Sequence, residues 1–140
     1  MSATLYAAVT LVEGMHFRGT NPRGQGVDMD SRPAGEPSAG ASPAELVLQA
    51  AGGCTGMDVV FILRKRKLEP EVLEVKLEGS KRDELPRIYE AIKVTFRAKG
   101  AGITLEDLEK AAGLSFSKYC SVINTLKPAA KITYSCEIIP

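Results

Sequence analysis

One long helix in the middle of the chain constrains the fold more than any other feature. Ser42, Pro43 and Glu45 form a helix start: serine caps, proline suits the first helical position, and a glutamate three residues after the cap completes a capping box. The residues that follow predict a helix from Pro43 to about Lys67. The other predicted elements are shorter and are arranged before and after this helix.

Glycines interrupt this helix in an unusual place. Gly52, Gly53 and Gly56 each cost roughly 1 kcal/mol relative to alanine in a helix interior. Such a cost needs a physical reason. Either another backbone approaches the helix closely here, or the residue between the glycines, Cys54, has to be accessible.

The elements on either side of the helix are segregated. Strands are predicted over 3–12, 15–19 and 27–30 before it; strands over 73–78 and 92–98, helices over 104–113 and 115–127, and a strand over 130–139 follow it. Alternating apolar and polar residues make 73–78 and 92–98 antiparallel partners. This order indicates the α+β class with antiparallel sheets, and the length fits one domain spanning 1–140.

Charge and composition exclude several classes of partner. Lys and Arg (18) nearly balance Asp and Glu (17), so a nucleic-acid partner is not expected. The first residues lack a secretory pattern, and no stretch approaches the roughly 20 apolar residues of a membrane span. The three cysteines do not suit a disulfide framework. We therefore expect a cytoplasmic protein with reduced thiols and no membrane partner.

The cysteines are the residues most able to carry chemistry. Cys54 lies deep in the long helix, where the helix dipole is weak, so a nearby cation would be needed to lower its pKa. Cys120 is expected in the middle of a later helix. The alternative for both is a small buried hydrophobic residue. Cys136 alternates with Ile132 and Ile138 in the last strand and is expected in the core.

Metal chemistry has little support in the sequence. His16 is the only histidine, and the cysteines show no CxxC spacing, so no metal site is expected. A hydrolytic pair of Cys54 and His16 is conceivable, and it would predict ester cleavage that is lost in His16→Ala. Nothing near His16 in the sequence supports it.

Three segments carry a resemblance to a known family. They are Ser42-Pro43-Ala44-Glu45-Leu46, Ala50-Ala51-Gly52-Gly53-Cys54 and Lys118-Tyr119-Cys120-Ser121-Val122. They resemble the OsmC/Ohr family of thiol-dependent peroxidases, within an OsmC-like, YhfA-type branch, and the resemblance covers nearly the whole chain. It implies an α+β homodimer with interleaved strands, an active site at the dimer interface, and no cofactor.

The resemblance also implies roles for individual residues. Cys54 would be the peroxidatic thiol and Cys120 the resolving thiol, which together reduce organic hydroperoxides in oxidative stress defence. The resulting disulfide would be reduced by an external thiol. Arg18, which follows the Glu13-Gly14 turn, would activate Cys54; the alternative is a solvated charge at a strand end.

The carboxylate that orients this arginine in the family fits less well here. Its usual position holds Ala44, and Glu45 is one residue later. On an ideal helix Glu45 lies about 180° from Cys54, and the alternative role for it is helix capping. Asp58 shares the Cys54 face within about 40° and could hold Arg18, although an unpaired carboxylate would raise the thiol pKa.

A second function stays open at this stage. The chain could be a catalytically weak protein of the OsmC fold that binds a small apolar ligand at the dimer interface. Cys54 and Cys120 would then be packing residues. The shifted carboxylate favours this alternative, and the presence of both cysteines in their motifs favours the peroxidase.

Overall fold

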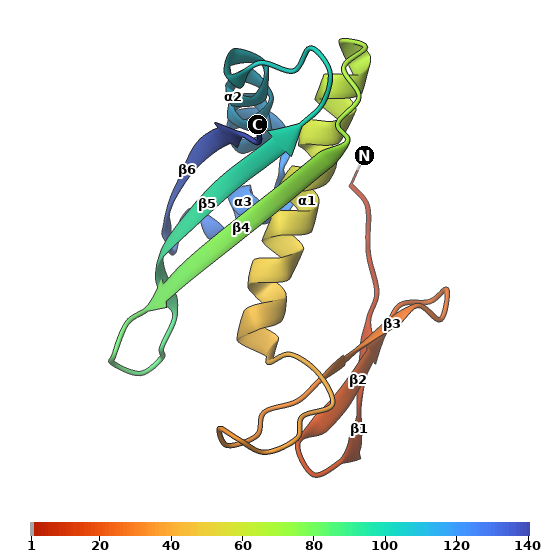
Figure 1. The fold of residues 1–140 in the computed structure, drawn as a ribbon. Coiled ribbons are helices and arrows are strands. Elements are labelled where there is room, and N and C mark those ends of the chain that lie inside the picture. The colour runs from red at the N-terminus through yellow and green to blue at the C-terminus, as the bar shows by residue number, and fades with distance from the viewer. Residues whose placement is uncertain (1) are drawn as a thin grey trace. The chain divides into compact units, whose positions relative to one another are not determined.

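A computed structural model describes residues 2–140. The chain forms two compact units, one up to Val47 and the other Leu48–Pro140. The order of elements is three strands, a long helix, two strands, three helical segments and a last strand, shown along the chain in Figure 1. This is the predicted α+β order.

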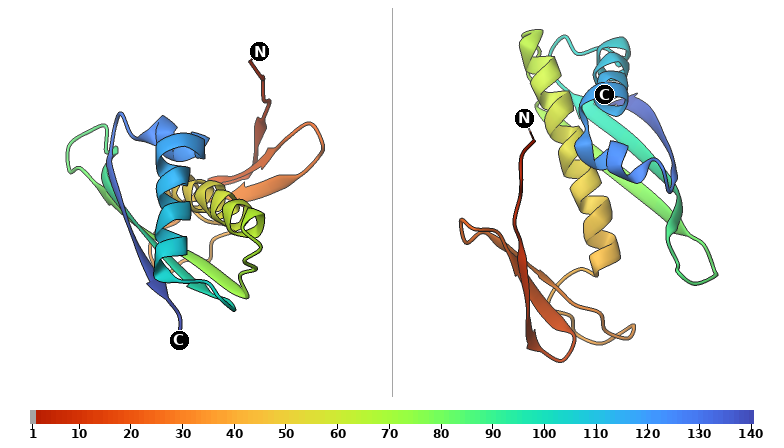
Figure 2. Two further views of the ribbon diagram at one scale, coloured as in Figure 1. Left: turned by 90° about the horizontal axis from the view of Figure 1, so that it is seen from above. Right: turned by 180° about the vertical axis from the view of Figure 1, so that it is seen from behind.

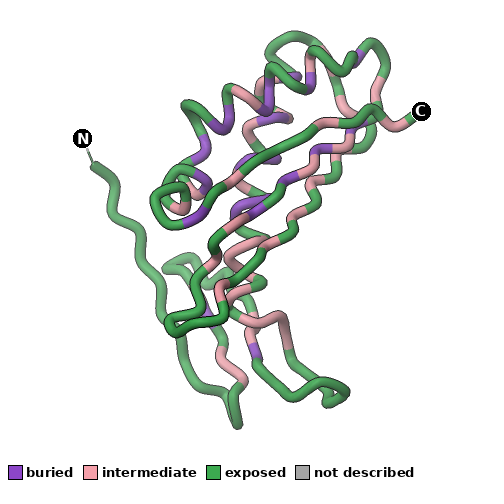
Figure 3. Tube along the Cα trace, turned by 90° about the vertical axis from the view of Figure 1, so that its left-hand side faces the viewer, coloured by how far each residue is buried: buried purple, intermediate pink, exposed green. Residues whose placement is uncertain are grey.

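The first unit contains an antiparallel sheet with the strand order β1-β2-β3. Its strands are β1 (Ala8–Glu13), β2 (His16–Thr20) and β3 (Gly26–Met29). The turn between β1 and β2 places Gly14 at φ +53°, a conformation that glycine adopts without steric cost. Every residue of β1 is exposed, and the strand starts five residues later than predicted. Figure 3 shows this exposure as an almost continuous green trace.

The long helix α1 is Pro43–Lys65: it starts where the capping box predicts and ends two residues before the predicted Lys67. The Ser42 backbone N–H donates to Glu45 Oε1 at 3.0 Å, and the Glu45 N–H donates to Ser42 Oγ at 3.2 Å. By length and composition alone α1 could cross a membrane, which the sequence prediction did not foresee. However, its Val59 and Leu63 side chains are fully buried, and it serves as the core helix of the second unit.

The second unit has a sheet with the order β4-β5-β6. Its strands are β4 (Val72–Lys81), β5 (Tyr89–Lys99) and β6 (Lys131–Ile138). β4 and β5 pair antiparallel as predicted, but β5 and β6 pair in parallel. The prediction of purely antiparallel sheets was wrong here, because helical segments connect β5 to β6 and such a crossover permits a parallel pair.

Helices cover one face of this sheet, and Figure 2 shows them on the same side. They are α1, α2 (Leu105–Leu114), the π-helix η1 (Ser115–Tyr119) and α3 (Ser121–Leu126). The core between helices and sheet includes Phe96, Leu108 and Ile123, all fully buried. The opposite face is polar: Arg97 pairs with Glu74 at 3.1 Å and with a second glutamate on β6 at 3.3 Å.

Candidate functional site

Cys54 lies on α1 with its sulfur half-buried against the start of α3. Its Sγ is 3.8 Å from Ser121 Oγ, and the backbone N–H of Val122 and the Cys120 thiol also act on it as hydrogen-bond donors. All three donors come from one short segment of chain. The structure therefore brings the two predicted cysteine motifs together.

Cys120 is not in the middle of a helix, and that prediction was wrong. It is the N-cap of α3: its backbone is extended, with φ −73° and ψ 106°, and its Sγ accepts the Ile123 N–H at 3.4 Å. The Cys120 N–H donates to Ser115 O at 2.8 Å, which closes the wide turn of η1. Because the chain leaves the helical conformation at this residue, the thiol can face α1.

The two thiols differ in acidity. Burial raises the pKa of Cys54, but the Val122 N–H and the Cys120 and Ser121 side chains outweigh it, so the pKa lies below the ordinary 9.0; the nearby Asp58 charge opposes them. Burial raises the pKa of Cys120 to about 11. The sequence led us to expect a cation beside Cys54, whereas the neighbours that lower its pKa most are uncharged donors. Cys54 therefore ionises at a lower pH than Cys120, and a thiolate is the reactive form of a cysteine.

A buried chain of hydroxyl groups lies next to Cys54. Thr55 Oγ1 is 2.7 Å from Ser115 Oγ, and Ser115 Oγ donates to Asp58 Oδ2 at 2.8 Å. Since the only Ser115 hydroxyl proton goes to Asp58, Thr55 must be the donor to Ser115. Sequence reasoning missed this network. Its signal was Thr55 itself, a polar residue on the same helical stripe as Ala51 and Val59, where a buried hydroxyl needs a partner.

The residues predicted to activate Cys54 have partners of their own. Arg18 on β2 donates from Nη1 to Asp28 Oδ2 at 2.9 Å, and His16 Nε2 lies 2.9 Å from the other oxygen of the same carboxylate. The hydrogen bond with His16 is the main cause that lowers the pKa of Asp28, and Arg18 adds to it. Glu45 caps α1, the role that the sequence left open for it. Asp58 accepts from Ser115, and its pairing with Arg18 stays a prediction.

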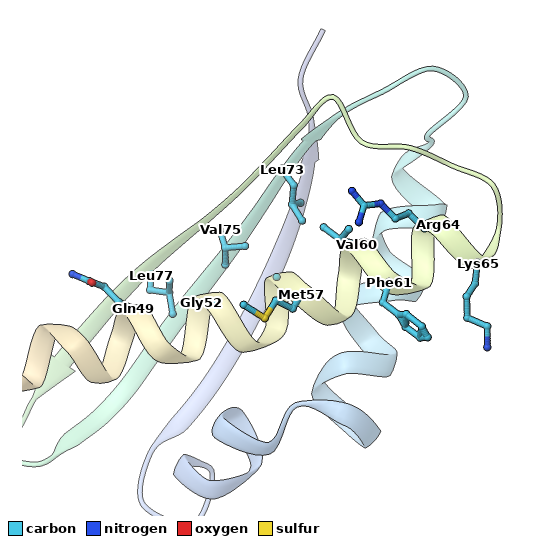
Figure 4. A pocket seen from close by; sticks show the side chains of 12 residues that line it. Gln49, Gly52, Met57, Val60, Phe61, Arg64, Lys65, Leu73, Val75 and Leu77 are labelled. Carbon is cyan, nitrogen blue, oxygen red and sulfur yellow. The ribbon is translucent and has the colours of Figure 1, made fainter. Parts of the chain in front are cut away.

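Two hollows flank α1 in the second unit. We call the larger one, about 980 Å³, the α1–β4 groove. Figure 4 shows the side chains that line it. They include Met57, Phe61, Val60, Leu73, Val75 and Leu77, with Gln49, Arg64 and Lys65 at its margins. A second hollow of about 650 Å³ is lined by residues of α1, α2 and η1, including Asp58, Ile62, Leu114 and Tyr119.

The groove explains two of the glycines. A Cβ on Gly52 would lie 2.6 Å from Leu77 Cδ1, so a side chain at this position would require the Leu77 methyl group on β4 to move. A Cβ on Gly53 would meet nothing within 4 Å, so this position faces open space. Close approach, by a side chain rather than a backbone, therefore applies to Gly52, whereas Cys54, for which access was expected, is half-buried.

No group of three or more His, Cys, Asp or Glu side chains suited to a metal ion occurs among residues 2–140. His16 Nε2 lies 2.9 Å from Asp28 Oδ1, and the hydrolytic pair of His16 with Cys54 stays a prediction. Cys136 packs against the core, as predicted, and burial raises its pKa to about 11. Cys54 and Cys120 are thus the thiols that the structure places together.

The fold and the site define a class: an α+β protein whose long core helix carries a thiol of lowered pKa beside a second thiol of raised pKa. Comparison with known proteins makes this specific. The model of the OsmC-like protein family matches residues 35–135. The chain belongs to the OsmC-like family, as the sequence motifs predicted.

Relatives span the whole chain. Protein YhfA of Escherichia coli K12 is 38% identical over 96% of this chain and 98% of its own length. A hypothetical protein from Aquifex aeolicus is 28% identical, with a TM-score of 0.83, covering 99% of this chain and all of that one. The organic hydroperoxide resistance protein OhrB of Bacillus subtilis is 17% identical, with a TM-score of 0.64, covering 96% of this chain and 98% of that one, and shares the fold.

Proposed function

We propose that the protein is a cofactor-free thiol peroxidase that reduces organic hydroperoxides in oxidative stress defence. The observation that carries this proposal is the meeting of two unlike thiols, Cys54 with a lowered pKa and Cys120 with a raised one. A thiolate is the attacking species, and a neutral thiol can donate its proton when the disulfide forms. Family membership and the organic hydroperoxide resistance proteins among its structural relatives support the same reaction.

The proposed cycle consumes one hydroperoxide and one dithiol, and it releases an alcohol, water and a disulfide. The Cys54 thiolate attacks the terminal oxygen of ROOH, the O–O bond breaks, and the alkoxide takes a proton to leave as ROH, which gives a sulfenic acid. The Cys120 sulfur then attacks Cys54 Sγ, and its proton and the sulfenic hydroxyl leave as water. An external dithiol reduces the disulfide and is itself oxidised to a disulfide.

In this proposal the hydrogen-bond donors of residues 120–122 supply part of the stabilisation of the Cys54 thiolate that a nearby cation would otherwise supply. The Val122 N–H and the Ser121 hydroxyl stabilise the thiolate as charge-assisted donors. Arg18 is proposed to complete the site by stabilising the developing negative charge of the leaving oxygen. Asp28, which already binds Arg18, and Asp58 are the candidate carboxylates to orient it; Glu45 is committed to capping.

We further propose that the working form is a cytoplasmic homodimer. Met57 is 75% exposed and Phe61 58% exposed on α1, and Val9, Leu11 and Val12 of β1 are each more than half exposed. Apolar surface of this extent marks an interaction site in a soluble protein. A second copy of the chain would cover it, and the free thiols suit a reducing compartment.

The groove favours one alternative function. Its lining is mainly apolar, so a member of this family with weak peroxidase activity could bind a small apolar ligand there. In that case the acidity of Cys54 would be incidental. The alternative predicts saturable binding of an apolar fluorescent probe that survives replacement of both Cys54 and Cys120.

Turnover of cumene hydroperoxide with dithiothreitol tests the proposal. The wild type should consume peroxide and Cys54→Ser should be inactive. Cys120→Ser treated with peroxide in the absence of dithiothreitol should accumulate a sulfenic acid that dimedone traps. Cys136→Ser is the matched control and should retain activity, since this cysteine packs against the core. Equal activity of the wild type and Cys54→Ser would refute the proposal.

A further inference from the structure

Two buried hydroxyl groups are hydrogen-bonded to each other on the segments that lead to the thiol pair, namely α1 and η1. Thr55 and Ser115 are both fully buried, although they are polar and belong to segments 60 residues apart in sequence. Their hydrogen bonds run in one direction, from Thr55 to Ser115 and on to Asp58. Apolar residues of the same size would fill this space, so the directional bonds need an explanation.

The position of Ser115 supplies that explanation. Ser115 is the first residue of η1, and its carbonyl accepts the Cys120 N–H across the wide turn. A π-turn adds one residue to a regular helix, which rotates everything after it by about 100° and shifts it by about 1.5 Å. The direction in which the Cys120 side chain points therefore depends on whether the extra residue of this π-turn is retained.

The network fixes the π-turn against the helix that carries Cys54. The Ser115 side chain is bound from α1 on both sides, by Thr55 as donor and by Asp58 as acceptor, while its carbonyl holds Cys120. Thr55 directly follows Cys54 in sequence. The same few atoms thus connect the backbone of the first cysteine to the backbone of the second.

We propose that Thr55 and Ser115 are positioning residues of the thiol pair. They hold the π-turn so that the Cys120 thiol and the Val122 N–H face Cys54 Sγ. Asp58 contributes as the acceptor that fixes the direction of the chain of hydrogen bonds. The inference rests on the proposed role of Cys120 as the resolving thiol, but not on the identity of the oxidant.

The test therefore uses diamide, which oxidises two thiols to a disulfide and takes up their two electrons and two protons itself. Disulfide formation between Cys54 and Cys120 is followed by mass spectrometry in a Cys136→Ser background. Loss of the hydroxyl in Ser115→Ala should slow it by about tenfold, because a small misplacement of reacting groups has large effects on rate. Thr55→Val should slow it less, since Ser115 still donates to Asp58.

Two controls separate positioning from stability. Thr55→Ser keeps the hydroxyl and should restore the rate, and Thr95→Val, a half-buried threonine on β5, should leave it unchanged. The pH profile of Cys54 alkylation should also move to higher pH in Ser115→Ala, because the Val122 donor is displaced. A variant that only lost stability would not show this shift while it remains folded.

The outcomes distinguish this inference from the proposed function. Wild-type rates of disulfide formation in Ser115→Ala and Thr55→Val would overturn it and leave the peroxidase proposal intact. Should Ser115→Ala fail to fold, Thr55→Val and its Thr55→Ser rescue decide alone. A wild type that forms the disulfide with diamide but does not turn over hydroperoxides would refute the proposed function and leave the positioning role standing.

Discussion

Replacing Ser121 with alanine should raise the pKa of Cys54 without changing the fold. Ser121 Oγ is 3.8 Å from Cys54 Sγ and is one of the groups that favour the thiolate. Ser121 is exposed at the start of α3, so its removal leaves no cavity. The substitution therefore isolates one donor of the proposed thiolate site.

The expected size follows from the geometry. A hydrogen bond to a charged group contributes about 1.5–3 kcal/mol. The long S···O distance and solvent access reduce this to about 0.7 kcal/mol, and since one pKa unit corresponds to about 1.36 kcal/mol, the pKa should rise by about half a unit. At a pH below the Cys54 pKa of both proteins, the variant therefore has about one third of the thiolate that the wild type has. Cys54 should then react about threefold more slowly in the variant.

The assay is the rate of Cys54 alkylation by iodoacetamide as a function of pH, read by mass spectrometry in a Cys136→Ser background. The threefold difference in alkylation rate should vanish at a pH well above the Cys54 pKa of both proteins. Cys54 is then fully ionised in the wild type and in the variant. Ser117→Ala, an exposed serine of η1, is the matched control. Superimposable pH profiles for wild type and Ser121→Ala would refute the assignment of Ser121 as a donor.

Three further predictions concern the helix, the Cys136 thiol and the groove. In urea denaturation, Gly52→Ala should leave the protein about 1 kcal/mol less stable than Gly53→Ala does, because the new Cβ would lie 2.6 Å from the Leu77 Cδ1 methyl, which has to move. Gly53→Ala faces open space and should be neutral or stabilising by up to about 1 kcal/mol. The Cys136 thiol, with its pKa raised from 9.0 to about 11, stabilises the fold below about pH 9 and loses this contribution as pH rises towards about 11. Between about pH 9 and about pH 11, the free energy of unfolding of Cys136→Ala should therefore fall by about 1 kcal/mol less than that of the wild type. Equal decreases would contradict the burial argument. Met57→Glu should convert a dimer to a monomer in light scattering while circular dichroism is unchanged, whereas Lys76→Glu on β4 should not; an unaffected dimer would exclude the groove as its interface.

The sequence predicted what depends on neighbouring residues. The capping box gave the start of α1, alternation gave β4 and β5, and the cysteine motifs gave the family. Each of these signals lies within a few consecutive residues. Local chemistry was enough because propensity and pattern agreed with the tertiary structure.

What the sequence did not reveal depends on distant contacts. The wide turn of η1 is held by Ser115, whose hydrogen-bond partners lie on α1, so no local pattern marks Cys120 as an N-cap. The parallel pairing of β6 likewise follows from the crossover that precedes it. The donors around Cys54 include a backbone N–H, which every residue except proline carries, so its role could not be read from residue type.

The central claim is that Cys54 is an activated thiol whose oxidised form Cys120 traps. Its most direct test is a single-turnover reaction of the fully reduced protein with one equivalent of cumene hydroperoxide, followed by stopped flow and intact-mass analysis. Cys54 should be oxidised much faster than free cysteine, and the product should be two hydrogens lighter than the reduced protein and contain a Cys54–Cys120 disulfide. Oxidation no faster than free cysteine, or a product without that disulfide, would contradict the central claim.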